Sequence, residues 1–296
     1  APSTTTAPTT GSAEAITLVF SFSDPETNNM YANIFKPWFA QIEQSTEGKV
    51  KFEPHFMGEL VGLMEAYDAV VKGTVDMAFI RQATMPQFKL DSIVEAGYYS
   101  DKCLRPSQVY NELYQNYPEM QAAYEDVKVL LLYTMPPGYL GTSKVPVSKI
   151  QDVKGLKLIT SNQLMAQRAA ALGAASISVP PPEFYPSLEK GVADGGMTVT
   201  QPEMITYKWA DVIKNITKIE CLRPTCGVVM NMDKWNSLPD DVKKIIDQMN
   251  PSIVELADKA MFNAHTEALT ALPEPPYNVK FVEPDEAMLS AFEAAD

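Results

Sequence analysis

The sequence has few of the residues from which enzymes build catalytic and metal sites. It contains 2 histidines in 296 residues, His55 and His265. General bases, zinc ligands and catalytic triads need histidines or acidic clusters at defined spacings, and the sequence offers none. Glycine-rich phosphate-binding loops are absent as well. We therefore predict a protein that is not an enzyme and needs no cofactor or metal, with both histidines structural or exposed.

Long apolar runs and basic residues are also scarce. No run approaches the ~18 apolar residues that a membrane-spanning helix needs. The chain has 24 Lys and Arg against 37 Asp and Glu, which gives a net charge of −13. Nucleic acids and anionic membranes would repel such a chain, so neither is an expected partner. An anionic small ligand is not excluded, because it responds to the local field in a cleft.

Cysteine is rare, with 3 in the chain and no C-x-x-C pair, so a redox motif is not indicated. Cys221 and Cys226 flank the turn-forming pair Arg223-Pro224. Two interpretations stay open at this point: a local disulfide between them, which would leave Cys103 unpaired, or two buried free thiols.

The first residues of the chain differ in composition from the rest. Residues 1–15 are rich in Thr, Ser, Pro and Ala and cannot bury a core, so we predict a disordered tether. In an exported protein this tether would hold the globule off a membrane anchor, although a frayed terminus has the same composition. The chain begins with Ala1 rather than Met, as a processed or recombinant product would.

The stretch from Asp152 to Thr198 reads as three short strands alternating with two helices. In chain order we predict a strand at Leu156–Thr160, a helix capped by Asn162, a strand at Ile177–Val179, a helix at Glu183–Lys190 and a strand at Val192–Thr200. This alternation is typical of a parallel α/β layer. Ligands in such layers bind beyond the carboxyl ends of the strands, here near Ile159, Asn162, Pro181 and Thr198.

Four fragments of this sequence, in order, carry a family resemblance. They are G-T-V-D-M at Gly73–Met77, then D-V-K-G-L-K-L, A-L-G-A and P-P-P-E-F-Y-P-S-L-E-K-G-V-A-D-G. Together they resemble the solute-binding subunits of TRAP transporters, over roughly Ile16 to Glu283. The resemblance implies a periplasmic-binding-protein-like fold of two α/β lobes joined by a hinge. It also implies a monomer in the periplasm, or otherwise outside the cytoplasm, that encloses a small organic solute and passes it to TRAP membrane subunits.

The expected lobe boundaries follow from breaks in the pattern. Met135-Pro136-Pro137-Gly138 is the sharpest break, and we take it as the first crossing between lobes. Lobe I is then 16–138 plus 225–260, and lobe II is 139–224 plus 261–296. Other expected elements are a helix Asn28–Ser45 kinked at Pro37, a helix Trp209–Ile216, and two helices Pro239–Met249 and Val254–Leu269.

Three positions depart from the family pattern. Ile159 stands where the family has an arginine that grips the ligand carboxylate, and Thr198 stands where it has an assisting asparagine. Tyr139 falls near a position that often carries a second arginine. Ordinary carboxylate capture is therefore not expected. Either Arg81, at the end of the strand Val75–Ile80, supplies the charge, or the ligand is neutral or cationic.

The remaining candidates each have a structural alternative. Arg81 could form a salt bridge, for example to Glu65, instead of binding ligand. Glu65, at the family's acidic position, could bind a ligand amine or hydroxyl, or be a solvated acid at a helix start. Phe22 and Ser23 follow the first strand into the cleft. Further aromatic candidates for the cleft wall are Tyr139, Phe184, Tyr207 and Trp209. A sensor that presents its liganded state to a receptor is the alternative function.

Overall fold

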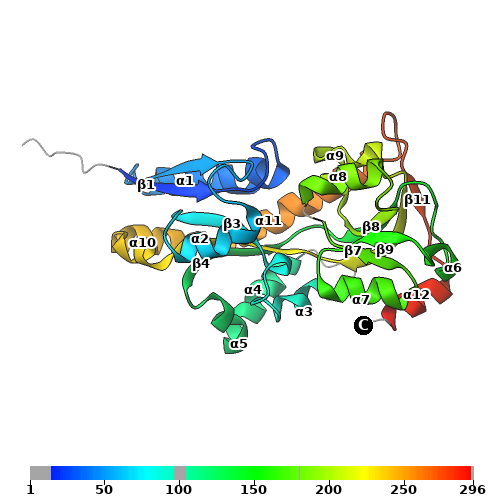
Figure 1. Ribbon diagram of the computed structural model, residues 1–296. Helices are drawn as coiled ribbons and strands as arrows, with labels where there is room; N and C mark the ends of the chain where they lie inside the picture. Colours follow the sequence, from blue (N-terminus) through cyan, green and yellow to red (C-terminus); the bar gives the residue numbers. More distant parts are fainter. Residues whose placement is uncertain (1–14, 97–104, 180, 295–296) are drawn as a thin grey trace, which may run out of the picture.

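The computed structural model describes residues 15–96, 105–179 and 181–294. The predicted tether and Cys103 fall on residues outside these ranges. The described chain forms two sheets, each with its own helices, that lie side by side (Figure 1). The prediction of a two-lobe α/β fold is thus confirmed. No helix within the described ranges is long and apolar enough to cross a membrane.

The sheet of lobe I has five strands in the order β2-β1-β3-β10-β4. Its strands are β1 Ile16–Ser21, β2 Val50–His55, β3 Met77–Arg81, β4 Val127–Thr134 and β10 Thr225–Asn231. The first three are parallel, and β10 runs antiparallel between β3 and β4. Because β3 ends at Arg81, that side chain is placed at the carboxyl edge of the parallel strands, where the sequence predicted it.

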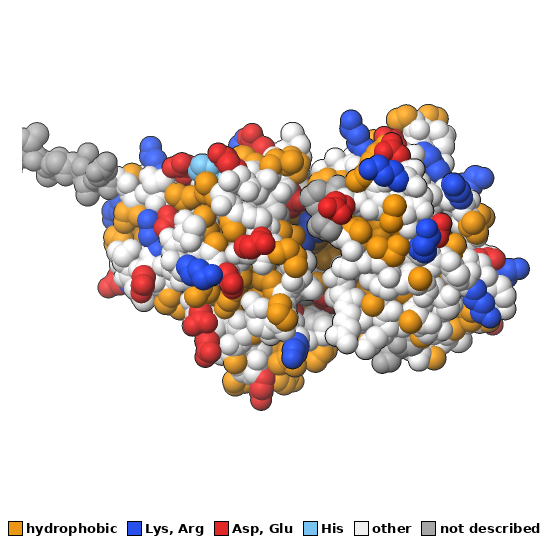
Figure 2. All heavy atoms as spheres, in the orientation of Figure 1, with side chains coloured by type: hydrophobic (Ala, Val, Ile, Leu, Met, Phe, Trp, Pro, Cys, Tyr) orange, Lys and Arg blue, Asp and Glu red, His pale blue; other side chains and the backbone are white. Residues whose placement is uncertain are grey.

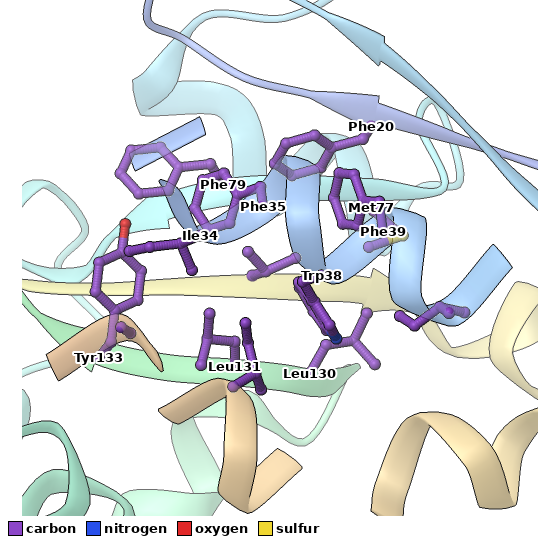
Figure 3. Packing of buried hydrophobic residues seen from close by; sticks show 14 of the residues in the cluster. Phe20, Ile34, Phe35, Trp38, Phe39, Met77, Phe79, Leu130, Leu131 and Tyr133 are labelled. Carbon is purple, nitrogen blue, oxygen red and sulfur yellow. The ribbon is translucent and has the colours of Figure 1, made fainter. Parts of the chain in front are cut away.

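Aromatic side chains from β1, β3 and the first helix fill the core on one face of this sheet (Figure 3). A π-helical turn, Tyr31–Phe35, precedes α1, Lys36–Ser45, and the change of winding falls just before Pro37, which has no amide hydrogen to donate. Phe22 belongs to this core. Its ring meets Phe35 and Phe79 edge-on at 5.5 and 5.2 Å between centroids, and it is fully buried. Phe22 is therefore a core residue and does not reach the cleft.

The sheet of lobe II has the order β11-β9-β5-β8-β6-β7. Its strands are β5 Gly138–Thr142, β6 Lys157–Ile159, β7 Ala175–Ile177, β8 Gly195–Val199, β9 Asn215–Leu222 and β11 Lys280–Val282. As predicted, β6, β7 and β8 pair in parallel. The helices between them are α7, Gln163–Ala171, and α8, Pro181–Glu189. Asn162 caps α7 by accepting a hydrogen bond from the Met165 amide at 2.9 Å, which confirms its capping role.

Two connections between strands cross from one sheet to the other, and these two connections lie next to each other. Met135–Pro137 joins β4 to β5, and Arg223-Pro224 joins β9 to β10. The Met135 amide donates to the Pro224 carbonyl at 2.8 Å, so the two connections are tied together. The lobe boundaries proposed from the sequence place these connections at the hinge.

A third crossing is made by α11, Asp240–Ala271, which packs on β4 of one lobe and on α9, Gln201–Thr206, of the other (Figure 1). The prediction of two separate helices here was wrong. Pro251 lies inside one continuous helix of 32 residues. Apolar residues on one side of α11 are buried in the core of lobe I, and Ala268 is buried in lobe II, so packing outweighs the hydrogen bond lost at the proline.

The remaining helices are short. They are η2 Leu63–Glu65, α2 Ala66–Val71, η3 Gln82–Thr84, α3 Asp91–Ala96, α4 Pro106–Asn116, α5 Pro118–Gln121, η4 Ala122–Tyr124, α6 Ile150–Val153, η5 Trp209–Asp211, α10 Met232–Ser237 and α12 Glu286–Glu293. The predicted helix Trp209–Ile216 was wrong beyond its first turn. Its second half enters β9, where Ile216 pairs with Phe281 and is buried in the sheet's core.

Of the two interpretations left open for Cys221 and Cys226, the structure has the free thiols, since both are unpaired and buried. Cys221 points into the core of lobe II and Cys226 into the core of lobe I, although only four residues separate them. The chain changes sheets between these cysteines, so their side chains diverge. Burial raises the pKa of both thiols above the ordinary range.

We predict that neither buried thiol reacts in the native state, because thiolate formation and reagent access are both suppressed. In a Cys103→Ser variant, a thiol reagent should label no cysteine within minutes at neutral pH and two cysteines after denaturation. A reducing agent should leave the melting temperature unchanged. Rapid native labelling, or a melting temperature that falls on reduction, would contradict this arrangement.

Candidate functional site

A cavity of about 450 Å³ lies between the two lobes at the hinge. A hollow is visible between the two halves of the surface in Figure 2. Arg81 and Thr84 line the cavity from lobe I, and Thr225 lines it from the hinge. The other lobe contributes Ile159, Thr198 and three further residues of the wall, Phe184, Glu203 and Trp209. The carboxyl ends of β3, β6 and β8 therefore converge on one space between the lobes, as expected for ligand sites in α/β layers.

Stacked aromatic rings form one wall of this cavity. Phe184, in the first turn of α8, stacks on Trp209 with 4.2 Å between ring centroids and 23° between planes. Tyr207 stacks on the same indole at 5.4 Å. Gly196 on β8 makes room for Phe184, because a Cβ at that position would lie 2.8 Å from the ring. The wall is thus positioned by packing that a larger residue at 196 would disrupt.

A buried ion-pair cluster connects the lobes beside the aromatic wall. Arg81 Nη2 lies 2.9 Å from Glu203 Oε1 and 3.5 Å from Asp24 Oδ2. Asp24 belongs to lobe I and also accepts a hydrogen bond from the Tyr207 hydroxyl of lobe II. Glu203, in the first turn of α9, accepts a second bond from Thr200 Oγ1 at 2.7 Å. Two carboxylates therefore surround one guanidinium.

The charge of Arg81 is secured by these neighbours. Burial alone would lower the pKa of Arg81, but Glu203 and Asp24 raise it well above its ordinary range. The salt bridge that was the structural alternative for Arg81 is present, but its partners are Glu203 and Asp24. Glu65, the partner suggested from the sequence, is exposed and does not pair with Arg81. Glu203 is not among the residues predicted from the sequence. An acidic residue after the strand that ends near Thr198 is the only signal that could have indicated it.

The other candidates fall into two groups. Ile159, Thr198 and Trp209 line the cavity with Arg81. Phe22, Ser23, Glu65, Tyr139 and Asn162 do not line it, and Pro181 begins α8. Ser23 contacts Asp24 at 3.5 Å, and Glu65 follows the lining residue Met64. Tyr139 packs edge-on against His265 at 6.1 Å, beside a separate cavity of 50 Å³ at the hinge.

The two histidines have ordinary structural surroundings. Burial lowers the pKa of His265 to about 4, so this ring is neutral near pH 7. His55 lies between Glu59 and Glu53, with 3.1 Å to each carboxylate. In the part of the chain that the structure describes, no three His, Cys, Asp or Glu side chains are grouped to hold a metal ion.

A second polar contact joins the lobes through Glu95 of α3. Its buried carboxylate accepts hydrogen bonds from the Thr225 amide at 3.0 Å, from Thr225 Oγ1 at 2.8 Å and from Asn162 Nδ2 at 3.0 Å. Asn162 therefore caps α7 and reaches across to lobe I at the same time. Burial, with a smaller contribution from the nearby Asp91, raises the pKa of Glu95 to about 7. The hydrogen bonds to its carboxylate oppose this rise.

This raised pKa predicts a pH-dependent stability. The pKa of Glu95 moves from an ordinary value of 4.5 to about 7 in the folded state. The folded protein therefore holds this proton where the unfolded chain has lost it, so the contribution is present below about pH 4.5 and lost as the pH rises through about 7. Relative to Glu95→Gln, the free energy of unfolding of the wild type should fall by roughly 3 kcal/mol between about pH 4 and pH 8. Denaturant unfolding at both pH values measures this, and a constant difference between the two proteins would contradict it.

Comparisons with known proteins agree with this geometry. TsaT of Comamonas testosteroni, an outer membrane transporter protein, is 24% identical over 251 residues, which cover 82% of this chain and 72% of that protein. A TRAP periplasmic solute-binding protein of Bordetella bronchiseptica, solved with (R)- and (S)-mandelate, is 26% identical with a TM-score of 0.87, over 95% of this chain and 89% of that chain. A TRAP solute-binding protein of Rhodoferax ferrireducens, solved with benzoate, has a TM-score of 0.83 and is 20% identical, over 95% of this chain and 88% of that chain.

The family itself is shown by a match over most of the chain. The model of bacterial extracellular solute-binding protein family 7, DctP, matches residues 20–295. The solved structures described above are solute-binding proteins with the same fold. The chain therefore belongs to the DctP family of extracellular solute-binding proteins, and it is not an enzyme.

Proposed function

We propose that the protein captures a small aromatic solute between its lobes and delivers it to the membrane subunits of a TRAP transporter. The observation that carries this proposal is the interlobe cavity with its stacked wall of Phe184 and Trp209. Its volume of about 450 Å³ falls within the range of small-molecule sites. Closure of two lobes about the hinge would exclude water and bury such a solute on all sides.

Similar proteins support an aromatic solute. The Bordetella protein was solved with mandelate and the Rhodoferax protein with benzoate, and both ligands carry one benzene ring. In this chain the apolar surfaces of Ile159, Val179 and Leu222 face the same cavity as the aromatic wall. A flat apolar ring gains most from such a surface, because burial and ring stacking both contribute.

We further propose that the usual carboxylate clamp is missing. Ile159 is 2% exposed and lines the cavity, so the position that the resemblance assigns to an arginine offers neither charge nor donor. Thr198 adds a hydroxyl to the cavity but no charge. One observation favours a second candidate, carboxylate binding through Arg81, because its Nε is buried without a hydrogen-bond partner. The two candidates differ in the ligand charge that they predict.

The location and assembly of the protein follow from this function. We propose a monomer outside the cytoplasm that is tethered to the membrane through the N-terminal segment. A sensor that presents its liganded form to a receptor would use the same cavity. A gene for a large membrane transport subunit beside this one favours transport, and a gene for a kinase favours sensing.

Binding in the proposed cavity should be visible in tryptophan fluorescence. Of the 3 tryptophans, Trp209 lines the cavity, and Trp38 and Trp235 are buried in the core of lobe I. Titration with a panel of benzoates, phenols, benzyl alcohols and aromatic amines should give a saturable change for at least one compound. The change should largely disappear in Trp209→Phe and persist in Trp235→Phe. A saturable response that survives Trp209→Phe and vanishes in Trp235→Phe would place the solute elsewhere.

Restoring the missing arginine should change ligand preference. In Ile159→Arg a guanidinium enters a cavity that has room for it, so simple aromatic carboxylates should bind at least roughly 10-fold more tightly than to the wild type. Calorimetry with benzoate measures this, and Ile159→Met controls for the added length without the charge. Tight binding of benzoate to the wild type, unaffected by Arg81→Gln, would show the interpretation of position 159 to be wrong.

A further inference from the structure

We propose that the captured solute is an aromatic amine, bound as a cation with its ammonium group against Glu203. This inference rests on the proposed function and specifies the ligand class of the same cavity. It assigns to Glu203 the selecting role that an arginine has in the family pattern.

The charges at the cavity are unequal. The residues that line it include one cation, Arg81, and one anion, Glu203. Asp24 adds a second anion through its contact with Arg81 and is itself buried. The cluster of Asp24, Arg81 and Glu203 therefore carries one surplus negative charge in a space shielded from water. A cationic ligand neutralises that surplus, whereas an acid adds a third carboxylate to it.

Arg81 already pairs with two protein carboxylates, and we assign it the role of positioning Glu203. Its Nη2 contacts a carboxylate of each lobe, at 2.9 Å to Glu203 and 3.5 Å to Asp24. A ligand carboxylate would have to share this one guanidinium with two protein carboxylates. The unpartnered Nε can still donate to a neutral oxygen, such as a hydroxyl group of the ligand.

Glu203 retains the capacity to bind an ammonium group. Each of its oxygens accepts one hydrogen bond, Oε1 from Arg81 and Oε2 from Thr200. A carboxylate offers about four lone-pair sites, so acceptor positions remain on both oxygens. Glu203 and the ring wall of Trp209 and Phe184 line the same cavity. One ligand in this cavity can therefore meet both the carboxylate and the rings.

A matched series of three probes tests the ligand charge. The probes are 2-amino-1-phenylethanol, mandelamide and mandelate, which share a phenyl ring and a benzylic hydroxyl and are cationic, neutral and anionic at pH 7. Calorimetry with the wild type should rank the amine first and the acid last. The amine should bind at least roughly 10-fold more tightly than the acid, as expected for one charge-assisted hydrogen bond.

Two variants locate the selecting charge. Glu203→Gln keeps the size of the side chain and should lower the ratio of amine affinity to mandelamide affinity by roughly 10-fold or more, because mandelamide reports any change in the lobe contact itself. Asp24→Asn removes an equal charge from outside the cavity lining, so it should weaken amine binding less than Glu203→Gln does. Retained mandelamide binding shows that each variant is folded and closes on a ligand.

The outcomes separate this inference from the proposed function. Tighter wild-type binding of mandelate than of the amine, or an amine affinity unchanged in Glu203→Gln, overturns the inference and leaves aromatic capture standing. A wild type that binds none of the three probes, and no compound of a wider aromatic panel, overturns both.

Discussion

One buried guanidinium is paired with carboxylates of both lobes. Arg81 ends a strand of lobe I, and its charge is paired with Asp24 of the same lobe and Glu203 of the other. Moving such charges out of water costs several kcal/mol per ion, and only close partners offset that cost. Separation of the lobes would break the contact between Arg81 and Glu203, and water would then have to solvate both groups.

The same cluster organises the ligand cavity. Asp24 holds the Tyr207 hydroxyl, and the Tyr207 ring stacks on Trp209. The polar contact between lobes is thus linked to the aromatic wall by one side chain. Glu203 faces the cavity because Thr200 and Arg81 fix its two oxygens. The residues that line the cavity and those that connect the lobes are therefore partly the same, and under the proposed function a ligand that alters the charge balance of the cluster would alter the closure as well.

The sequence predicted the features that depend on local pattern. The alternation of strands and helices indicated the parallel layer of lobe II, and a strand-end position placed Arg81 at the cavity. Features that depend on packing between distant segments escaped prediction. Asp24 and Glu203 come together around Arg81 only because the two lobes meet. Their spacing along the chain does not indicate that they are close. The divergence of Cys221 and Cys226 reflects a change of sheet between adjacent strands. Phe22 directly follows β1, and its ring packs in the core against Phe79 of β3 and Phe35 of the π-helical turn instead of reaching the cleft.

If the Arg81 cluster holds the lobes together, small-angle X-ray scattering of the unliganded protein should detect its loss. Arg81→Gln leaves two carboxylates facing each other without a cation, so we expect a larger radius of gyration than that of the wild type. The triple variant Asp24→Asn, Arg81→Gln, Glu203→Gln removes that repulsion and should be more compact than Arg81→Gln alone. Equal radii of gyration for the wild type and Arg81→Gln, with both proteins folded, would show that the cluster does not hold the lobes together.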